Sequence, residues 1–329
     1  MLTKAQFEAV VAQANLAPSI HNAQPARWRQ SGDVIEIAAD RGVSLPLADP
    51  TGAHVGLSCG AAVEATIMAL STLGMSAQVT DHWDDADTRG WPGCRMVARL
   101  ELSEGAVSDP LAAQIEKRFT WRGAFSTLPV RLFGWSRGDA VFVMDAPVRG
   151  WLAQLNDQAS LQILRHRAFR RELLSWMRLS PAHPRYRYDG LSRDALHLDR
   201  FAARRLGYGF GPLWLVLHAA GKTAAMTAEA DLTLTAPLIV CFHRPIGESA
   251  VSSGRAYLRL CLEAAHLGLA GWPMAALTDD PDAAAQISVQ LAIGPDRQLI
   301  QVLRFGVPTG TPPPRARRPL QELISTPLG

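Results

Sequence analysis

Two segments of the chain repeat the same pattern, and this limits the folds that the chain can adopt. Residues 58–75 and 252–269 align without a gap, with Ser58 opposite Ser252, and a glycine ends each apolar run. A helix that is apolar almost all round is expected to be buried, serine is a frequent N-cap, and glycine is a frequent C-terminal stop. The pattern predicts two buried central helices that begin at their serines. Chance agreement between two Ala- and Leu-rich helices is the alternative.

The flanks of these two segments also correspond. A run typical of a strand precedes and follows each one, and a further helix is expected near residues 3–16 and near residues 109–118. Helices mixed with strands in this order predict an α+β fold made of two halves, each a β-sheet covered by helices around a buried central helix. The expected strands are Val34–Ile37, Met96–Leu100, Pro237–Phe242 and Leu299–Leu303.

The expected division of the chain follows from this repeat. The first half spans residues 1–108 and the second half spans residues 109–329. The least symmetric stretch, about 150–235, is interpreted as an insertion that covers or borders a site. Residues 308–319, which begin the C-terminal arm 308–329, are rich in proline and arginine and are expected to be extended rather than packed.

Composition excludes several classes of protein. The net charge of +3 over 329 residues is too small to indicate nucleic-acid binding, and the basic run 165–171 is expected to be a solvated helix face. The four cysteines form no C-x-x-C pair and the nine histidines no H-E-x-x-H, so no metal is expected and the thiols should be free and mostly buried. No signal core or run of about 18 apolar residues is present, which predicts a cytoplasmic protein. Residues 56–60 match the G-x-S-x-G pattern of a hydrolase nucleophile elbow, but they follow a loop instead of a strand, which argues against a serine hydrolase.

The residues most suggestive of chemistry lie in the loop 17–25. Pro18 breaks the preceding helix, and Ser19, His21, Asn22 and Gln24 follow before a second proline. Such a loop offers several neutral donors and acceptors at fixed positions, which suits a planar heterocycle such as a flavin ring. An ordinary polar loop is the alternative.

Two further segments are basic. Arg118 and Arg122 flank Thr120 and, if helical, share one face, an arrangement that suits a phosphate. Arg315 and Arg317 lie in the C-terminal arm, which could close over a phosphate. A solvated basic helix end and a frayed tail are the respective alternatives.

Together these segments resemble the nitroreductase family of FMN enzymes. The loop resembles the family's P-S-x-x-N-x-Q-P motif, and residues 118–122 resemble its R-x-S-x-[RK] signature, with Thr120 in the serine position. The arm resembles the basic-x-basic-x-P segment that precedes Leu-Gln-Glu-Leu-Ile, and residues 268–272 resemble a G-L-G-x-x-W run. The resemblance covers most of the chain and is thinnest at residues 140–235. It implies a nitroreductase-like fold.

The family is homodimeric, with FMN at the subunit interface, and here the two parts of one site are divided between the halves. The resemblance therefore implies the single-chain duplicated branch, with one FMN per chain, as a monomer (a pseudo-dimer) or a weak homodimer. The resemblance implies that the loop contacts the ring edge or the ribityl chain of FMN. It implies that the arginine segments contact the ribityl chain and the phosphate, and that the run 268–272 approaches flavin N5. The residues concerned are Pro18, Ser19, His21, Asn22, Gln24, Arg118, Thr120, Arg122, Gly271, Trp272, Arg315 and Arg317.

The implied activity is NAD(P)H-dependent reduction of nitro, quinone or enone-like acceptors by ping-pong hydride transfer through flavin N5, with no catalytic acid or base assigned. Two alternatives stay open. The protein could bind and sequester flavin without turnover, because the insertion and the arm could exclude nicotinamide. It could also be a specialised flavin dehydrogenase that oxidises an unknown metabolite.

Overall fold

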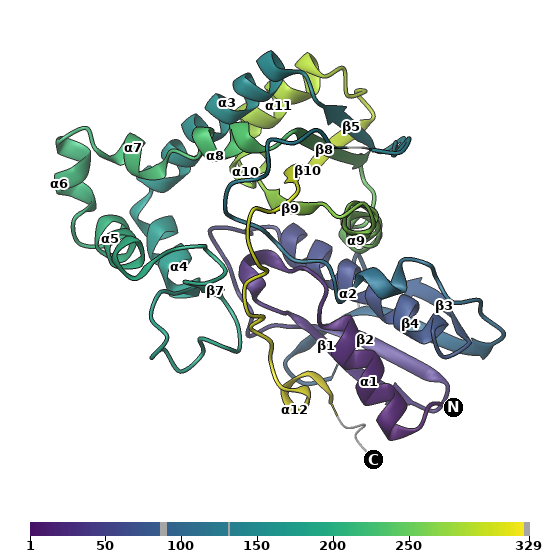
Figure 1. Cartoon of the computed structure of the whole chain (residues 1–329). Helices are drawn as coiled ribbons and strands as arrows, with labels where there is room; N and C mark the ends of the chain where they lie inside the picture. Colours follow the sequence, from purple (N-terminus) through teal and green to yellow (C-terminus); the bar gives the residue numbers. More distant parts are fainter. Residues whose placement is uncertain (86–90, 131, 326–329) are drawn as a thin grey trace.

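Two antiparallel sheets of four strands organise the chain (Figure 1). The computed structural model describes residues 1–85, 91–130 and 132–325. The first sheet has the order β1-β2-β4-β3 and the second has the order β5-β8-β10-β9. The strands are β1 Ala26–Ser31, β2 Val34–Asp40, β3 Met75–Asp81, β4 Cys94–Glu104, β5 Ala140–Val143, β8 Leu238–Pro245, β9 Ala270–Pro273 and β10 Arg297–Gly306. The expected α+β class and the four expected strands are confirmed.

A long helix follows the second strand of each sheet. The helix α2 (Ala53–Ser71) joins β2 to β3, and α9 (Ala250–His266) joins β8 to β9. The two sheets therefore share both their strand order and the place of their long helix. Both helices are largely buried, as predicted. By length and composition α2 could span a membrane, but 83% of its apolar window is buried inside the protein, which makes it a core helix.

The two long helices cross backbone to backbone at a pair of glycines. A Cβ atom added to Gly60 would lie 2.1 Å from the carbonyl oxygen of Val251, and one added to Gly254 would lie 2.2 Å from that of Leu57. Val251 lies one helical turn before Gly254 in α9, and Leu57 lies one helical turn before Gly60 in α2. The crossing is therefore the same when viewed from either helix.

The predicted starts of these helices were wrong. Ser58 lies inside α2, where its hydroxyl donates to the carbonyl of His54, and the carboxylate of Asp49 accepts the first free N–H groups instead. Ser252 likewise lies inside α9, whose N-cap is Ser249. A cap upstream of the aligned segments lets each helix begin earlier. The predicted end is confirmed for α9, where Gly268 directly follows the C-cap with a φ angle of 76°, whereas Gly74, with a φ angle of 72°, lies two residues beyond the C-cap Thr72 of α2.

Only the first of the two leading helices is present as an α-helix. The helix α1 spans Lys4–Ala14 and begins with a capping box between Thr3 and Gln6. Near residues 109–118 there is only a short 3-10 turn, η2 (Ala112–Gln114). Beyond that turn the chain is extended, because Thr120 forms a parallel bridge with Gly271 at the edge of the second sheet.

The segment between β5 and β8 has a packed part and a projecting part. The helix α3 (Ala146–Arg165) packs on the second sheet through Leu152, Leu155 and Ala159. Residues 167–235 form the helical excursion, whose helices α4 to α7 project to the left in Figure 1. Its elements are α4 Arg167–Trp176, β6 Met177–Arg178, β7 Leu191–Ser192, α5 Arg200–Phe210, α6 Trp214–Ala219, α7 Thr223–Thr227 and α8 Ala230–Thr235. The helices α10 (Ala276–Asp279) and α11 (Pro281–Gln290) pack beside α3 and β10.

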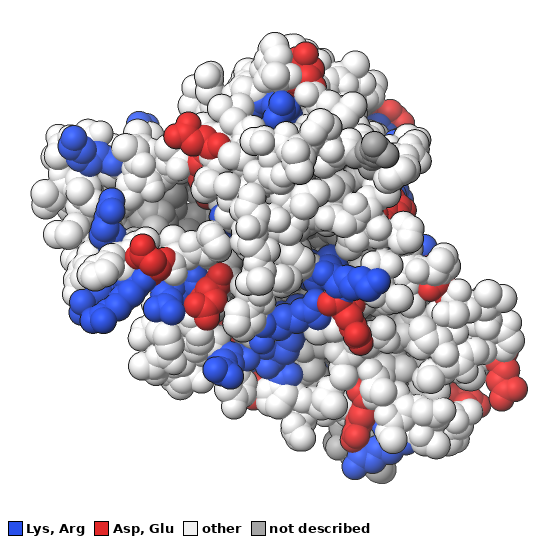
Figure 2. All heavy atoms as spheres, viewed as in Figure 1, with Lys and Arg blue, Asp and Glu red and all other residues white. Residues whose placement is uncertain are grey.

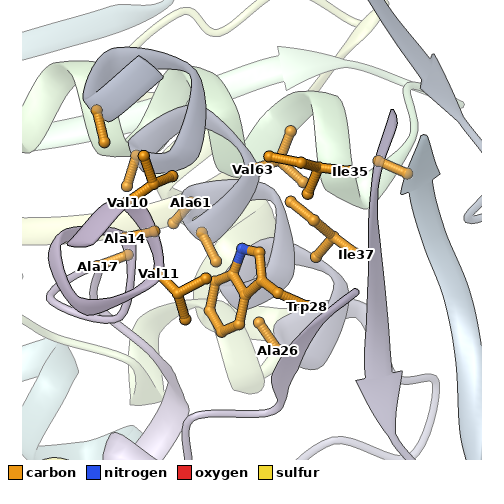
Figure 3. Close-up of a cluster of buried hydrophobic side chains, with 14 of the residues drawn as sticks. Val10, Val11, Ala14, Ala17, Ala26, Trp28, Ile35, Ile37, Ala61 and Val63 are labelled. Carbon is orange, nitrogen blue, oxygen red and sulfur yellow. The ribbon is translucent and has the colours of Figure 1, made fainter. Parts of the chain in front are cut away.

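The C-terminal arm returns from the second sheet to the first half (Figure 1). Residues 311–319 contain no helix or strand, as predicted, and α12 (Leu320–Leu323) then packs beside α1 and β1. Leu323 is fully buried, and the backbone N–H of Ser325 donates to the carbonyl of Trp28. Trp28 belongs to the core cluster shown in Figure 3. The arm is thus fastened at its far end; its last four residues lie outside the described part of the chain.

All four cysteines are free, and three of them are buried, as expected. Burial raises the pKa of Cys59 and Cys241 to about 12 and that of Cys261 to about 11. Cys94 is only half-buried.

Candidate functional site

Four segments that are distant in sequence meet around a cavity of about 100 Å³, here called the arginine cavity. They are the loop 18–22, residues 118–122, residues 190–195 of the helical excursion and residues 313–317 of the arm. Eight of the twelve predicted site residues line this cavity: Pro18, Ser19, Asn22, Arg118, Thr120, Arg122, Arg315 and Arg317. His21, Gln24, Gly271 and Trp272 do not line it.

Residues 118–122 do not form a helix, so the condition under which Arg118 and Arg122 would share a helix face is not met. The N–H of Trp121 donates to the carbonyl of Gly271 at 3.1 Å, which continues the bridge between Thr120 and Gly271. The edge of β9 offers backbone partners that a single helical turn would not. Alternate residues of an extended segment point to the same side, so Arg118, Thr120 and Arg122 face the cavity together.

The guanidinium groups of the arginine cavity contact neutral oxygen atoms only. Arg118 donates to the carbonyl of Leu16 at 3.1 Å, and Arg122 donates to that of Ala195 at 3.0 Å. Arg317 donates to Oδ1 of Asn22 at 2.8 Å. Arg315 donates to the backbone carbonyls of residues 116 and 118. Within the described residues, none of these four groups has a carboxylate within ion-pair distance.

This cluster of like charges is costly without an anion. Burial lowers the pKa of Arg122 to about 10, and burial together with repulsion from Arg118 and Arg315 lowers that of Arg317 to about 9. The Nε atoms of Arg118 and Arg317 are buried and have no hydrogen-bond partner. Buried cations normally have a counter-charge, so the cavity fits an anion with several oxygen acceptors.

The loop that forms one wall of the cavity is held in an uncommon conformation. His21, Asn22 and Gln24 have φ angles of 46°, 55° and 53°. The Oγ of Ser19 accepts the N–H of Gln24, and the N–H of Ile20 donates to the Oγ of Ser58, each at 3.0 Å. Non-glycine residues with positive φ are uncommon and cluster at functional sites. The contacts fix the loop before any ligand arrives.

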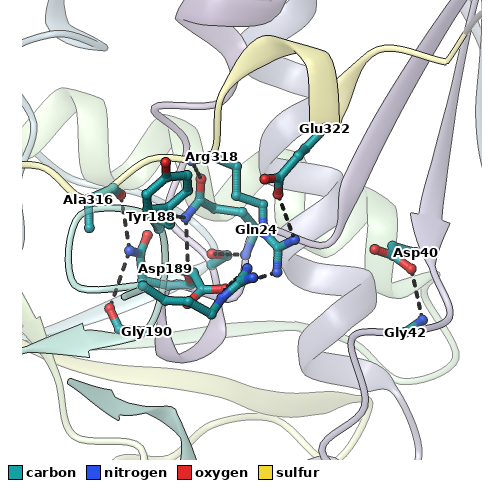
Figure 4. Close-up of polar contacts among 12 residues, drawn as sticks. Gln24, Asp40, Gly42, Tyr188, Asp189, Gly190, Ala316, Arg318 and Glu322 are labelled. Carbon is teal, nitrogen blue, oxygen red and sulfur yellow. Dashed lines mark hydrogen bonds and ion pairs between the residues drawn. The ribbon is translucent and has the colours of Figure 1, made fainter. Parts of the chain in front are cut away.

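The side chains of Asn22 and Gln24 connect this loop to the arm and to the helical excursion (Figure 4). Asn22 Nδ2 donates to the carbonyls of Gly190 and Ala316, at 3.3 and 3.1 Å. Gln24 is buried; its Nε2 donates to the carbonyl of Tyr188 at 2.8 Å, and its Oε1 accepts an N–H from the arm. Gln24 therefore fastens the wall of the cavity from behind.

A buried carboxylate that the sequence analysis missed completes this connection. Asp189 is 1% exposed and accepts hydrogen bonds from Arg178 and Arg318, at 2.9 and 3.0 Å, and from Arg185. Burial opposes its ionisation, but the hydrogen bonds from Arg185 and Arg178 hold the pKa of its carboxyl below the usual range. Asp189 thus joins the excursion to the arm, and these two segments form the outer cover of the cavity.

His21 lies behind the cavity wall. Its Nε2 atom is buried without a hydrogen-bond partner. Burial, with added repulsion from Arg122 and His54, lowers its pKa to about 4. The imidazole is therefore neutral at physiological pH and adds no fifth positive charge to the four arginines.

Gly271 and Trp272 lie next to the cavity rather than in its wall. Gly271 lines a small neighbouring hollow together with Arg118 and Thr120. A Cβ atom at Gly271 would lie 2.6 Å from the ring of Phe305, so a larger residue would not fit. Trp272 packs beneath Arg304, whose guanidinium carbon lies 3.3 Å from the ring centroid.

A larger cavity of about 860 Å³ lies beside the start of α2. It is lined by the start of α2, the α3–α4 junction, the start of α9 and the α10–α11 junction. In its wall His54 Nε2 lies 2.9 Å from Oδ1 of Asp279. Burial opposes protonation of His54, but this hydrogen bond raises its pKa above the usual value.

Comparison with known proteins gives a partial match. The chain is 36% identical over 123 residues to “Putative NAD(P)H nitroreductase Rv3131” and, equally, to “Putative NAD(P)H nitroreductase MT3217”, both from Mycobacterium tuberculosis. The match covers 37% of this chain and 34% of each relative. A scan against models of known protein families finds no match. The resemblance to nitroreductases is thus confirmed over about a third of the chain.

Solved structures give weaker similarities. The FMN- and NADPH-dependent nitroreductase NfnB from Sphigopyxis sp. strain HMH is 20% identical, with a TM-score of 0.34 over 66% of this chain and 98% of that one. The FMN-dependent NfnB from Mycobacterium smegmatis, solved with NADPH, is 18% identical, with a TM-score of 0.33 over 60% of this chain and 86% of that one.

Proposed function

We propose that the protein is an FMN-dependent NAD(P)H oxidoreductase and that the arginine cavity holds the phosphate of FMN. The observation that carries the proposal is the convergence of Arg118, Arg122, Arg315 and Arg317, from two distant segments, without a carboxylate partner. A phosphate brings negative charge and three strong acceptor oxygens to such donors. The match to NAD(P)H nitroreductases over 123 residues supports the same assignment.

The residues present fit FMN at this end of the molecule. Buried Nε atoms on Arg118 and Arg317 lack partners, and Thr120 and Ser19 place hydroxyl groups on the same cavity. In this proposal the arginines bind and neutralise the phosphate, while the hydroxyl groups orient the ribityl chain. When bound, the flavin supplies the hydride-transfer chemistry. Because the imidazole of His21 is neutral, the arginines balance the negative charge of the phosphate in this proposal.

The larger cavity gives the proposal room for an acceptor. The loop 18–22 contacts α2 next to this cavity, since the N–H of Ile20 donates to Ser58 and the neighbouring Leu57 lines the cavity. Its volume of about 860 Å³ is within the range of small-molecule sites. Flat nitro, quinone or enone-like acceptors are the substrate class that we propose.

We infer that the two halves, 1–108 and 109–329, arose by internal duplication. Both sheets have the same strand order, and the glycine crossing of α2 and α9 repeats in both directions. The loop 18–22 comes from one half, while the arginines of 118–122 and the arm come from the other. One complete site per chain follows, and a monomer should bind one FMN.

A second candidate, flavin sequestration without turnover, has one observation in its favour. The arm and the helical excursion close over the arginine cavity and are joined by the ion pair of Arg318 with the buried Asp189. A cover fastened in this way could keep nicotinamide away from a bound flavin. The two candidates make the same prediction for FMN binding and differ in turnover.

Flavin content tests the shared part of both candidates. We expect purified protein to be yellow and to hold one FMN per chain, and Arg118→Ala with Arg122→Ala to weaken FMN binding by at least about a hundredfold, since each charge-assisted contact contributes about 1.5–3 kcal/mol. The exposed Arg204→Ala on α5 is the matched control and should keep its FMN. A colourless wild type that takes up no added FMN would overturn the assignment, as would a double variant that keeps it.

Steady-state oxidation of NAD(P)H with menadione or a nitroarene separates the candidates. Turnover by FMN-loaded protein supports the oxidoreductase. Bound FMN that neither NADH nor NADPH reduces supports sequestration.

A further inference from the structure

A second group of arginines surrounds a separate pocket in the helical excursion, here called the excursion pocket. It has a volume of about 580 Å³ and lies between the start of α4 and the α5–α6 turn. Its lining contains four arginines, a histidine and two aromatic rings, and no carboxylate. These residues are Arg165, Arg167, Arg170, Arg171, His218, Phe210 and Trp214.

Arg170 makes the floor of this pocket rigid, so the prediction of a solvated face for the whole run 165–171 was wrong at this residue. Arg170 is 4% exposed, and its guanidinium carbon lies 4.1 Å from the ring centroid of Trp214. Its Nη1 donates to the carbonyl of Leu164 at 2.6 Å, and its Nε donates to that of Phe210 at 3.3 Å. One guanidinium therefore ties the ends of α3 and α5 together beneath the pocket.

The other three arginines have no counter-charge. Arg165, Arg167 and Arg171 are exposed, and among the described residues their guanidinium groups have no hydrogen-bond or ion-pair partner. The neighbouring Glu172 is occupied, because it accepts the N–H groups of Leu47 and of the following residue. The sequence from 200 to 228 contains no aspartate or glutamate. The opposite wall therefore supplies no negative charge either.

The excursion pocket thus repeats the charge pattern of the arginine cavity. Elsewhere in the excursion and beside it, buried guanidinium groups lie on carboxylates, as Arg178 does on Asp189 and Arg304 does on Glu229. Arginine is the residue best suited to bind phosphate oxygens through its planar fork. Four arginines that converge on a pocket without carboxylates favour a ligand with more than one phosphate charge.

We propose that the excursion pocket is a second ligand site that takes a small organic phosphate with a flat or apolar body, the class to which nucleotides belong. Arg165, Arg167 and Arg171 hold the phosphate groups, and His218 with Leu215 contacts the body of the ligand at the rim. The concave shape and the volume of about 580 Å³ suit a small molecule. Figure 2 shows basic side chains on the left of the molecule, over the region that holds α4 to α6 in Figure 1.

Calorimetric titration of FMN-loaded protein with adenosine 2′,5′-bisphosphate, pyrophosphate and adenosine tests the site. We expect the bisphosphate to bind, pyrophosphate to compete with it, and adenosine alone to bind far more weakly. Arg167→Ala with Arg171→Ala should weaken binding of the bisphosphate by at least about tenfold and leave FMN content unchanged. Arg204→Ala with Arg205→Ala is the matched control, since it removes the same charge from the same excursion outside the pocket.

Each alternative outcome overturns the proposal. No binding of bisphosphate to the wild type at millimolar concentration removes the site. Equal weakening by both double variants shows a general charge effect instead of a pocket. Binding to anionic phospholipid vesicles without binding of the bisphosphate assigns this surface to membranes. Because FMN content is measured separately, loss of the flavin assignment and loss of this site are distinguishable.

Discussion

The crossing of α2 and α9 can be tested with one methyl group. Gly60→Ala would place a Cβ atom 2.1 Å from the carbonyl oxygen of Val251, well inside the 3.3–3.6 Å typical of carbon–oxygen contacts between backbones. The contact is with backbone, so no side-chain rotation relieves it. The two helices must therefore move apart.

The expected loss of stability follows from two opposing terms. Overpacking a core typically costs about 1–3 kcal/mol, and a clash between two backbones belongs at the upper end, about 3 kcal/mol. Alanine has a higher helix propensity than glycine, which offsets about 1 kcal/mol. The net loss for Gly60→Ala is therefore about 2 kcal/mol.

Gly150→Ala in α3 is the matched control. A Cβ atom at Gly150 meets nothing within 4 Å, so only the propensity term applies, and this variant should gain about 0.5–1 kcal/mol. Urea unfolding followed by circular dichroism measures both free energies of unfolding. If Gly60→Ala is as stable as Gly150→Ala, the helices do not cross at these glycines.

Three further perturbations have defined outcomes. Asp189→Asn leaves the buried guanidinium of Arg178 without a carboxylate and should cost about 3–5 kcal/mol in urea unfolding; an unchanged free energy would contradict the ion cluster. Between pH 6.5 and about 4, His21 is protonated in the unfolded state but not in the folded state, so the free energy of unfolding decreases as the pH falls. The variant His21→Asn lacks this titration and should therefore lose less stability than the wild type between pH 7 and pH 5. Equal losses would refute the buried imidazole. Cys94, the half-buried thiol, should react with a thiol reagent in the native protein, while three thiols react only after unfolding; two fast thiols would contradict the burial.

Hydrophobic periodicity was enough to predict two strands of each sheet and the central helices, but not the other two strands of each sheet or the residues at which the helices begin. The apolar runs around Ile239 and Val302 form buried strands because burial in the core removes their apolar side chains from water. The starts depend on single polar contacts. Asp49 caps α2 from outside the apolar run, and nothing in the aligned segments indicates that contact.

The candidate site was predictable in its parts and not in its assembly. Neighbouring residues such as Ser19 and Asn22, or Arg118 and Arg122, carry local patterns that sequence can show. The local rule failed for Arg118 and Arg122, because the edge of β9 at Gly271 competes for their backbone. The cover was not predictable, because Asp189 and Arg318 lie 129 residues apart and only the folded chain brings them together.

The charge pattern leads to one consequence that distinguishes a binding role from a structural role. If Arg122 is retained for an anion, then Arg122→Met removes a half-buried cation that, among the described residues, donates to the carbonyl of Ala195 and to no carboxylate. Flavin-free Arg122→Met should therefore unfold at the same urea concentration as flavin-free wild type, or at a higher one. Saturating FMN stabilises a protein by about 2.7 kcal/mol when its concentration is a hundred times Kd, and this gain should be largely lost in the variant. A flavin-free variant that is clearly less stable than the wild type would show that the guanidinium of Arg122 supports the fold, and the argument from uncompensated charge would fail.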